Sequence, residues 1–219
     1  LDEIETEIAH SLDFLSTSRR DVTERHRTMR AIFDHSWRLL QLEEQSVFRA
    51  LSVFRGGFQR QGAESVAGAS LRSISVLVDK SLLYRDSSGR YQIHELLRQY
   101  AAEKLTEVPE QEEVIRDLHC AYYAAFIQQR TEQLKGGNQR LALHEINLEI
   151  ANIRLGWQHA LAVRQLENIE PYLRGLRLFY YMRSQFRDGL DSFNMALEQL
   201  DEWITTDNDV TTNHRRVYA

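Results

Sequence analysis

The chain has 219 residues, of which 42% are hydrophobic and 27% charged, and these proportions are typical of a globular protein. Two prolines and one cysteine exclude a collagen-like or proline-rich chain, an internal disulfide and a multi-cysteine zinc site. The formal net charge of −5 argues against a general nucleic-acid binder, and no apolar run reaches the roughly 18 residues of a membrane span. We expect a cytoplasmic protein and, since the chain starts at Leu1 without Met, a piece of a longer one.

The first sixty residues predict three amphipathic helices. Apolar residues that recur every three or four positions place one helix at residues 2–16 and a second at about 26–40. A third helix begins at Leu42 and ends at Gly56-Gly57, since glycine readily adopts the left-handed conformation that caps a helix. This third helix is expected to bury four side chains, Val47, Phe48, Leu51 and Phe54.

The middle of the chain contains its clear β signal. Short helices are predicted near residues 60–67 and 71–80. Two short apolar runs, residues 81–85 and 90–93, then flank the turn-forming segment Asp86–Gly89, which indicates a β-hairpin. A further helix follows at once. Helices that lead into a β-hairpin are the ingredients of a winged-helix domain.

From Pro109 onward the chain is predicted to be helical throughout, and Pro171 is expected to start a helix. One apolar stripe comprises Val114, Leu118, Ala121, Tyr122 and Ala125, and the next comprises Ile146, Ile150, Ile153, Trp157 and Ala160. Residues 170–203 resemble one 34-residue tetratricopeptide repeat, with matching residues at Leu176, Tyr180, Gly189, Phe193 and Ala196. Arg177 and Asp201 depart from that pattern, and a plain helical hairpin is an equally good interpretation.

No motif in the chain predicts catalysis or metal binding. A phosphate loop, a Gly-x-Gly-x-x-Gly segment and a Gly-x-Ser-x-Gly segment are all absent from the sequence. The segment His94–Arg98 lacks the second histidine that a zinc-protease helix needs. Cys120 follows His119 directly, but neighbouring side chains on a helix point in different directions, so we expect Cys120 to be a small packed residue. We therefore assign no catalytic residue and no metal ligand, and expect no enzymatic activity.

The densest basic cluster lies at the start of the second predicted helix and contains Arg25, Arg27 and Arg30. These side chains could contact phosphate groups of a nucleotide or of DNA, or the surface of a partner. The alternative is that they pair with Glu24, with Asp34 or with the acidic first helix.

Five segments, in this order and spacing, resemble the region that follows the nucleotide-binding domain of STAND-class ATPases. Bacterial LuxR-type regulators are the most similar members, with NB-ARC switches further off. The segments are Glu24–Arg30, Ser36–Leu40, Leu51–Phe58, Leu77–Leu83 and His94–Ala101. The resemblance is strong over about residues 20–165, where Asn152–Trp157 is similar to the start of that family's helical repeats.

The resemblance implies that the winged helix is a lid on a nucleotide site rather than a DNA reader. The family's Met-His-Asp motif matches Ile93-His94-Glu95 here, which implies that His94 contacts a phosphate of ADP and holds the switch closed. Glu95 departs from the family's aspartate. The phosphate loop and the Mg²⁺ ligands would precede Leu1, so we expect no cofactor in this chain, and ADP or ATP with Mg²⁺ in the parent protein.

The implied organisation has three parts, which are a terminal helix of the upstream ATPase (1–18), a winged-helix domain (19–107) and a tetratricopeptide-like region (108–219). The implied function is that of a regulatory segment of a signal-transduction ATPase or transcriptional regulator. Its expected partners are the upstream nucleotide-binding domain and a protein or small-molecule inducer on the helical region, and no membrane. The alternative is a DNA-binding winged-helix regulator with a helical dimerisation or effector region, although the charge balance argues against nucleic acid as a partner.

Overall fold

A computed structural model describes residues 20–217, with side chains described for residues 29–203 and 205. The helix predicted at residues 2–16 therefore lies outside the described residues. The described chain is mainly helical and contains one small two-stranded antiparallel hairpin, which confirms the predicted fold class. It divides into two compact units, Leu1–Leu118 and His119–Ala219, and the division falls inside one helix.

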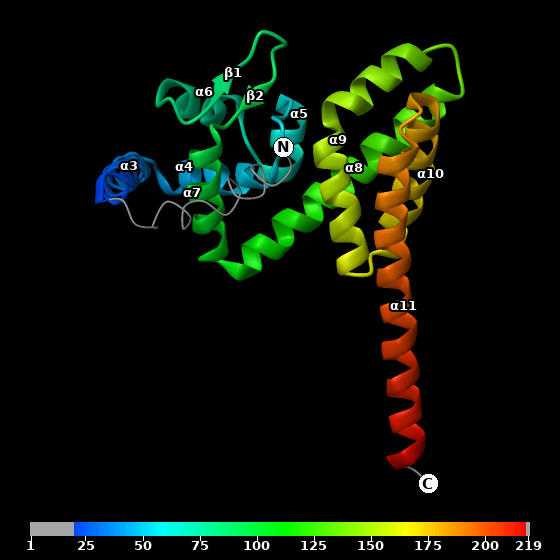
Figure 1. The fold of residues 1–219 in the computed structure, drawn as a ribbon. Coiled ribbons are helices and arrows are strands. Elements are labelled where there is room, and N and C mark those ends of the chain that lie inside the picture. Colours follow the sequence, from blue (N-terminus) through cyan, green and yellow to red (C-terminus); the bar gives the residue numbers. More distant parts are fainter. Residues whose placement is uncertain (1–19, 218–219) are drawn as a thin grey trace. The chain divides into compact units, whose positions relative to one another are not determined.

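The first unit contains the predicted short helices and the hairpin (Figure 1). The helix expected at about 26–40 already begins at Arg20. The helix that starts at Leu42 ends at Ala50 and continues as a tighter 3₁₀ turn, short of the two glycines. The elements in order are α3 (Arg20–Arg38), α4 (Leu42–Ala50), the 3₁₀ turn Leu51–Val53, α5 (Arg60–Ala67), α6 (Leu71–Asp79), β1 (Tyr84–Arg85), β2 (Tyr91–Gln92), α7 (Glu95–Thr106) and the first half of α8 (Pro109–Leu134).

The core of the first unit forms around α4 and the 3₁₀ turn. The four side chains predicted to be buried there are each at most 5% exposed, so that prediction is confirmed. Helices α6 and α7 contribute the remaining large apolar groups. These include Ile74, Leu77, Tyr100 and Leu105.

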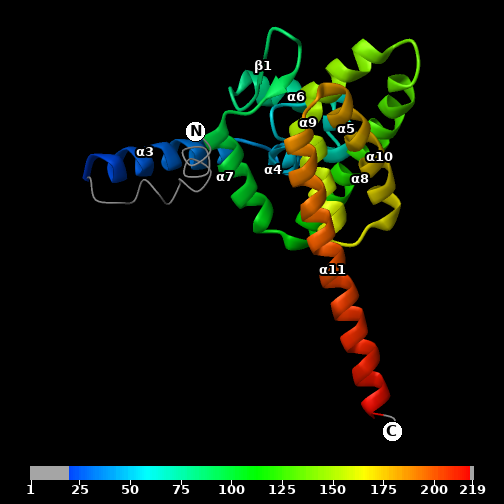
Figure 2. The ribbon, with the colours of Figure 1, turned by 45° about the vertical axis from the view of Figure 1, so that its right-hand side comes forward.

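The wing is shorter than the predicted strands but has an additional backbone partner. Ser81 adopts a left-handed φ of 58°, and the N–H groups of Leu82 and Leu83 donate to the carbonyl of Leu77, so this segment caps α6 instead of extending β1. Phe58 and Tyr91 exchange two backbone hydrogen bonds of 2.9 Å each. The hairpin is thereby tied to the loop before α5, while its turn projects outward (Figure 2).

The second unit is built from two helical hairpins. It contains the second half of α8, then α9 (Gln139–Ala162), α10 (Leu166–Arg183) and α11 (Phe186–Val217). Four of the five residues of the stripe predicted on α9 are buried, with Ile146, Ile153 and Ala160 fully buried and Trp157 2% exposed. The fifth, Ile150, is half-buried. Pro171 lies inside α10 and does not start it. The helix begins earlier because the carbonyl of Gln165 accepts hydrogen bonds from the N–H groups of Asn168 and Ile169.

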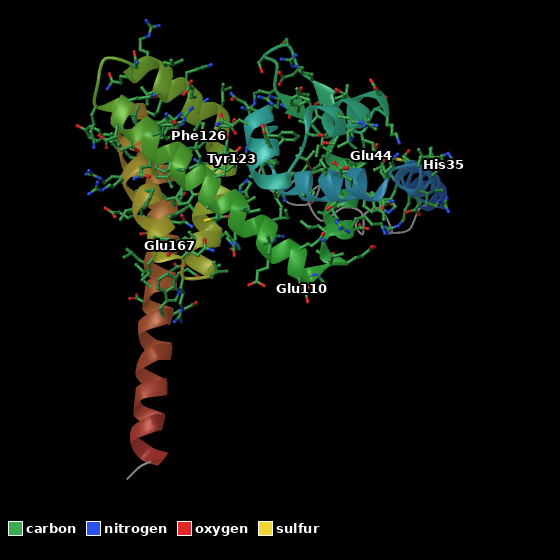
Figure 3. All side chains as sticks on the ribbon, turned by 180° about the vertical axis from the view of Figure 1, so that it is seen from behind. His35, Glu44, Glu110, Tyr123, Phe126 and Glu167 are labelled. Carbon is green, nitrogen blue, oxygen red and sulfur yellow. The ribbon has the colours of Figure 1, made fainter. Side chains whose placement is uncertain are left out.

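The apolar stripe predicted on α8 is wrong. Val114 and Leu118 are 55% and 44% exposed, whereas Cys120, Tyr123 and Ile127 are at most 1% exposed. Tyr123, which lies near Phe126 on α8 (Figure 3), donates a 2.9 Å hydrogen bond to the buried carboxylate of Glu149 on α9. The hydrogen bond to Glu149 therefore helps to bury the face of α8 that carries Tyr123, which the apolar periodicity did not indicate.

The α10–α11 hairpin packs through small and aromatic residues, as both interpretations of this segment, a tetratricopeptide repeat and a plain helical hairpin, predict. Gly189 of α11 lies against the side chain of Tyr180, where an added Cβ would lie 3.2 Å from the nearest carbon. The Tyr180 and Phe193 rings meet edge to face at 6.3 Å, and Ala196 is 7% exposed. Within the described residues, no helix is both long enough and apolar enough to cross a membrane.

Candidate functional site

The candidate site lies where the wing leads into α7. His94 is the residue before the first turn of α7, with an extended backbone whose carbonyl accepts the N–H of Arg98. Its imidazole is exposed and caps no backbone N–H of the helix. The side chain is therefore available to a ligand, as a contact with phosphate requires. A histidine that starts a helix and binds no ligand would be exposed in the same way.

Glu95 is engaged within α7. Its carboxylate accepts two hydrogen bonds from Arg98, at 2.8 and 2.6 Å, and one of 3.0 Å from Gln99. Burial alone would raise the pKa of Glu95, but the hydrogen bonds and the charge of Arg98 outweigh it and lower that pKa. Glu95, whose side chain is longer than the aspartate of the family that the sequence resembles, thus accepts hydrogen bonds from residues of its own helix.

Two guanidinium groups that no sequence pattern indicated meet beside this turn. Arg55 and Arg98 both donate to the backbone carbonyl of Ser52, at 3.0 and 3.3 Å. Burial, and after it the charge of Arg98, lowers the pKa of Arg55 to about 10. A guanidinium with a pKa of about 10 stays charged at neutral pH, and the single carboxylate of Glu95 only partly offsets two arginines beside the start of α7.

The wing itself is rigidly held. Arg90 is only 5% exposed and donates to the carbonyls of Gly57, at 3.0 Å, and Gly56, at 3.4 Å. Gly57 has a left-handed φ of 82°, and an added Cβ would lie 2.5 Å from the Gln92 side chain. A buried arginine and two glycines therefore fix the wing to the end of the 3₁₀ turn.

The helix that precedes the wing offers few groups for DNA. The exposed positions of α6 are Leu71, Arg72, Ser75 and Asp79, of which only Arg72 is a cation. Lys80, the other cation noted in the sequence, donates a 2.7 Å hydrogen bond to the carbonyl of Leu39. Direct readout of bases depends mainly on Arg, Lys, Asn and Gln side chains, so this face is poorly suited to it.

Of the three arginines of the basic cluster, the structure describes the side chain of Arg30. Arg30 pairs with Glu103 of α7 at 2.7 Å, a partner that was not among the expected carboxylates. Close by, Tyr100 donates a 2.8 Å hydrogen bond to Asp34, and burial, then this bond, raise the pKa of Tyr100. The side chains of Arg25 and Arg27 lie outside the described ones.

The remaining polar groups form no metal centre in the described part of the chain, where no three His, Cys, Asp or Glu side chains come together suitably. Cys120 is fully buried, as predicted, and its thiol contacts the Gly156 carbonyl at 3.3 Å. Each unit also has a cleft. A mainly apolar one of about 430 Å³ lies between α4, α5, α7 and α8, and a polar one of about 210 Å³ lies between α9, α10 and α11.

Three relatives of the chain among known proteins share one description. No protein-family model matches the chain, and no solved structure matches it. The chain is 32% identical over 206 residues to a protein of Mycobacterium bovis named "Putative HTH-type transcriptional regulator", and equally to proteins so named in two strains of Mycobacterium tuberculosis. The match covers 88% of this chain but 23% of each relative, so the chain spans about a quarter of their length.

Proposed function

We propose that this chain is a regulatory segment of a cytoplasmic transcriptional regulator and has no catalytic activity of its own. The match of 88% of the chain to proteins named as HTH-type transcriptional regulators carries this proposal. The order of α4, α5, α6 and the wing supports it, because two short helices followed by a hairpin are the parts of a winged helix-turn-helix. Two roles for this unit follow, and each rests on a different observation.

The name of the relatives favours DNA binding. In this role α6 would enter the major groove and the wing would lie along the backbone, with Arg72 and Arg85 as the exposed cations. Because the relatives are about four times longer than the matched segment, their helix-turn-helix can also lie in another part of the protein.

The surface chemistry favours a lid in a nucleotide switch. Of the four exposed side chains of α6, Leu71 is apolar and Asp79 is acidic. These groups suit contact with protein better than contact with phosphates. His94 at the exit of the wing is exposed and can donate one hydrogen bond to a phosphate oxygen. ADP or ATP with Mg²⁺ would be held mainly by another part of the longer protein, and an inducer would bind the helical region and shift the population of states.

A DNA titration separates the two roles. The 219-residue chain is mixed with duplex DNA from about 50 to 200 mM salt, because phosphate contacts make affinity fall steeply over this range. For a lid we expect weak binding that Arg72→Ala does not change. Binding that weakens with Arg72→Ala, but not with the control Arg174→Ala on α10, would establish the DNA role instead.

The lid role is tested on the longer protein by the rate of ADP release. We expect His94→Ala to speed release about tenfold or more, since one hydrogen bond to a charged phosphate contributes about 1.5–3 kcal/mol. His35→Ala is the matched control, because His35 is also exposed but lies on α3 (Figure 3). Equal release rates for the His94 variant and the unmodified protein would refute the phosphate contact.

A further inference from the structure

The polar cleft of the second unit is the size of one side chain. Its volume is about 210 Å³, below the roughly 300–1,000 Å³ of pockets that take drug-sized ligands. Helix α9 contributes Arg154 and Trp157, α10 contributes Tyr180, and α11 contributes Asp188, Asp191 and Met195. All three helices belong to one compact unit, so its packing positions these groups.

The one guanidinium in the cleft is already occupied. Arg154 donates to the Tyr180 hydroxyl at 2.9 Å and to the Asp188 carboxylate at 2.8 Å, and it lies 5.5 Å from the centre of the Tyr180 ring. An anionic ligand would have to displace Asp188 from this arrangement. Arg154 therefore holds Tyr180 and Asp188 in place along one wall of the cleft.

The second carboxylate is not occupied. Asp191 lies one turn after Asp188 on α11, is exposed, and forms no ion pair or side-chain hydrogen bond within the described part of the chain. The neighbouring Arg187, four residues earlier on α11, forms no ion pair with it there either. Two carboxylates thus face one guanidinium, and the cleft has an excess negative charge.

The other walls suit the carbon chain of a cation. Trp157 is 2% exposed, and its indole N–H donates to the Ser192 carbonyl at 3.3 Å, so the ring has no free donor at the base of the cleft. The Met195 side chain is a flexible apolar wall. Apolar groups beside a carboxylate suit the methylene groups of a side chain that ends in a cation.

We propose that this cleft binds the ammonium or guanidinium end of one basic side chain or small organic amine, with Asp191 as its counter-ion. The proposal goes beyond the function proposed above, which assigns no residues of the second unit to a ligand, and either can fail without the other. Free amines and lysine side chains of peptides share this chemistry, so the test includes both.

The experiment is a titration of the 219-residue chain, followed by NMR shifts of the Trp157 indole N–H and the Asp191 and Ser192 amides. The probes are n-butylamine, acetyl-Ala-Lys-Ala-amide and the same peptide with norleucine in place of lysine. We expect saturable shifts with one or both cations and none with norleucine. A response to the peptide alone would identify a protein segment as the source of the ligand, and a response to both would identify the amine as sufficient.

Variants on α11 test the counter-ion. We expect Asp191→Asn to weaken binding about tenfold or more, because a hydrogen bond between charged groups is replaced by a neutral one. Asp201→Asn removes an exposed carboxylate from the same helix outside the cleft and should leave the affinity unchanged. The proposal is overturned if neither cation binds, if Asp191→Asn binds equally well, or if inorganic phosphate or acetate causes the shifts instead.

Discussion

Asp86 holds the turn of the wing in one conformation. Its carboxylate accepts hydrogen bonds from the Ser88 hydroxyl and N–H, the Arg90 N–H and the Gln92 side chain, at 2.6 to 3.1 Å. The hydrogen bond from Ser88, and after it that from Gln92, lowers the pKa of Asp86 to about 2. A carboxylate that is bonded only in the folded chain makes the stability of that chain depend on pH.

We expect the Asp86 contribution to be lost in acid. The pKa of an unfolded aspartate is about 3.9, so this contribution is complete above that pH and disappears as the pH falls towards 2. Asp86→Asn should therefore lower the melting temperature at pH 7, with a difference that shrinks between about pH 4 and pH 2. Asp79→Asn, at an exposed end of α6, is the control. A difference that is constant with pH would contradict this account.

Close contact between helices in the second unit depends on glycine. A Cβ at Gly156 of α9 would lie 2.0 Å from the Tyr172 hydroxyl of α10, which itself donates a 2.7 Å hydrogen bond to the Cys120 carbonyl of α8. Gly175 similarly makes room for Ile127 of α8. Three helices therefore meet around one buried tyrosine, at positions where a side chain on the glycine would separate them.

We expect Gly156→Ala to destabilise the chain by about 1–3 kcal/mol in urea unfolding, even though alanine favours a helix by about 1 kcal/mol. Gly137→Ala is the control, because an added Cβ there meets nothing within 4 Å. The penalty should be smaller when Tyr172→Phe has removed the hydroxyl. Equal penalties in the two backgrounds would show that this contact is not the cause.

At the scale of the whole molecule, each compact unit has large buried side chains of its own. Leu77 is fully buried in the first unit and Ile153 in the second. Truncation of such a side chain leaves a cavity, which reduces stability by about 2–5 kcal/mol and acts on the groups that line it.

We expect the two truncations to loosen different parts of the chain in amide hydrogen exchange. Leu77→Ala should speed exchange in α4, α6 and α7, and Ile153→Ala in α9 and α10. Ser75→Ala, an exposed substitution on α6, should change neither. Uniform acceleration over both units by either variant would mean that they open as one cooperative body.

The candidate site shows where sequence patterns stop being informative. The motif around His94 predicted a phosphate contact, which stays a prediction, whereas the position of His94 at the start of a helix follows from the turn and helix signals on either side. The carbonyl partners of Arg90 and Arg98 could not be predicted, since Gly57 and Ser52 lie 33 and 46 residues earlier in the chain. Such contacts depend on the path of the chain and leave no side-chain pattern.

Local signals in the sequence determined the mainly helical fold, the position of the wing and the buried face of α4, because periodicity and turn residues act over a few positions. Only the tertiary structure decided which face of α8 is buried and that Arg30 pairs with Glu103. The tertiary structure also places Asp191 in the cleft between α9, α10 and α11, where it has no ion pair within the described residues. These outcomes depend on groups far apart in the chain, whose approach is governed by the packing of whole helices.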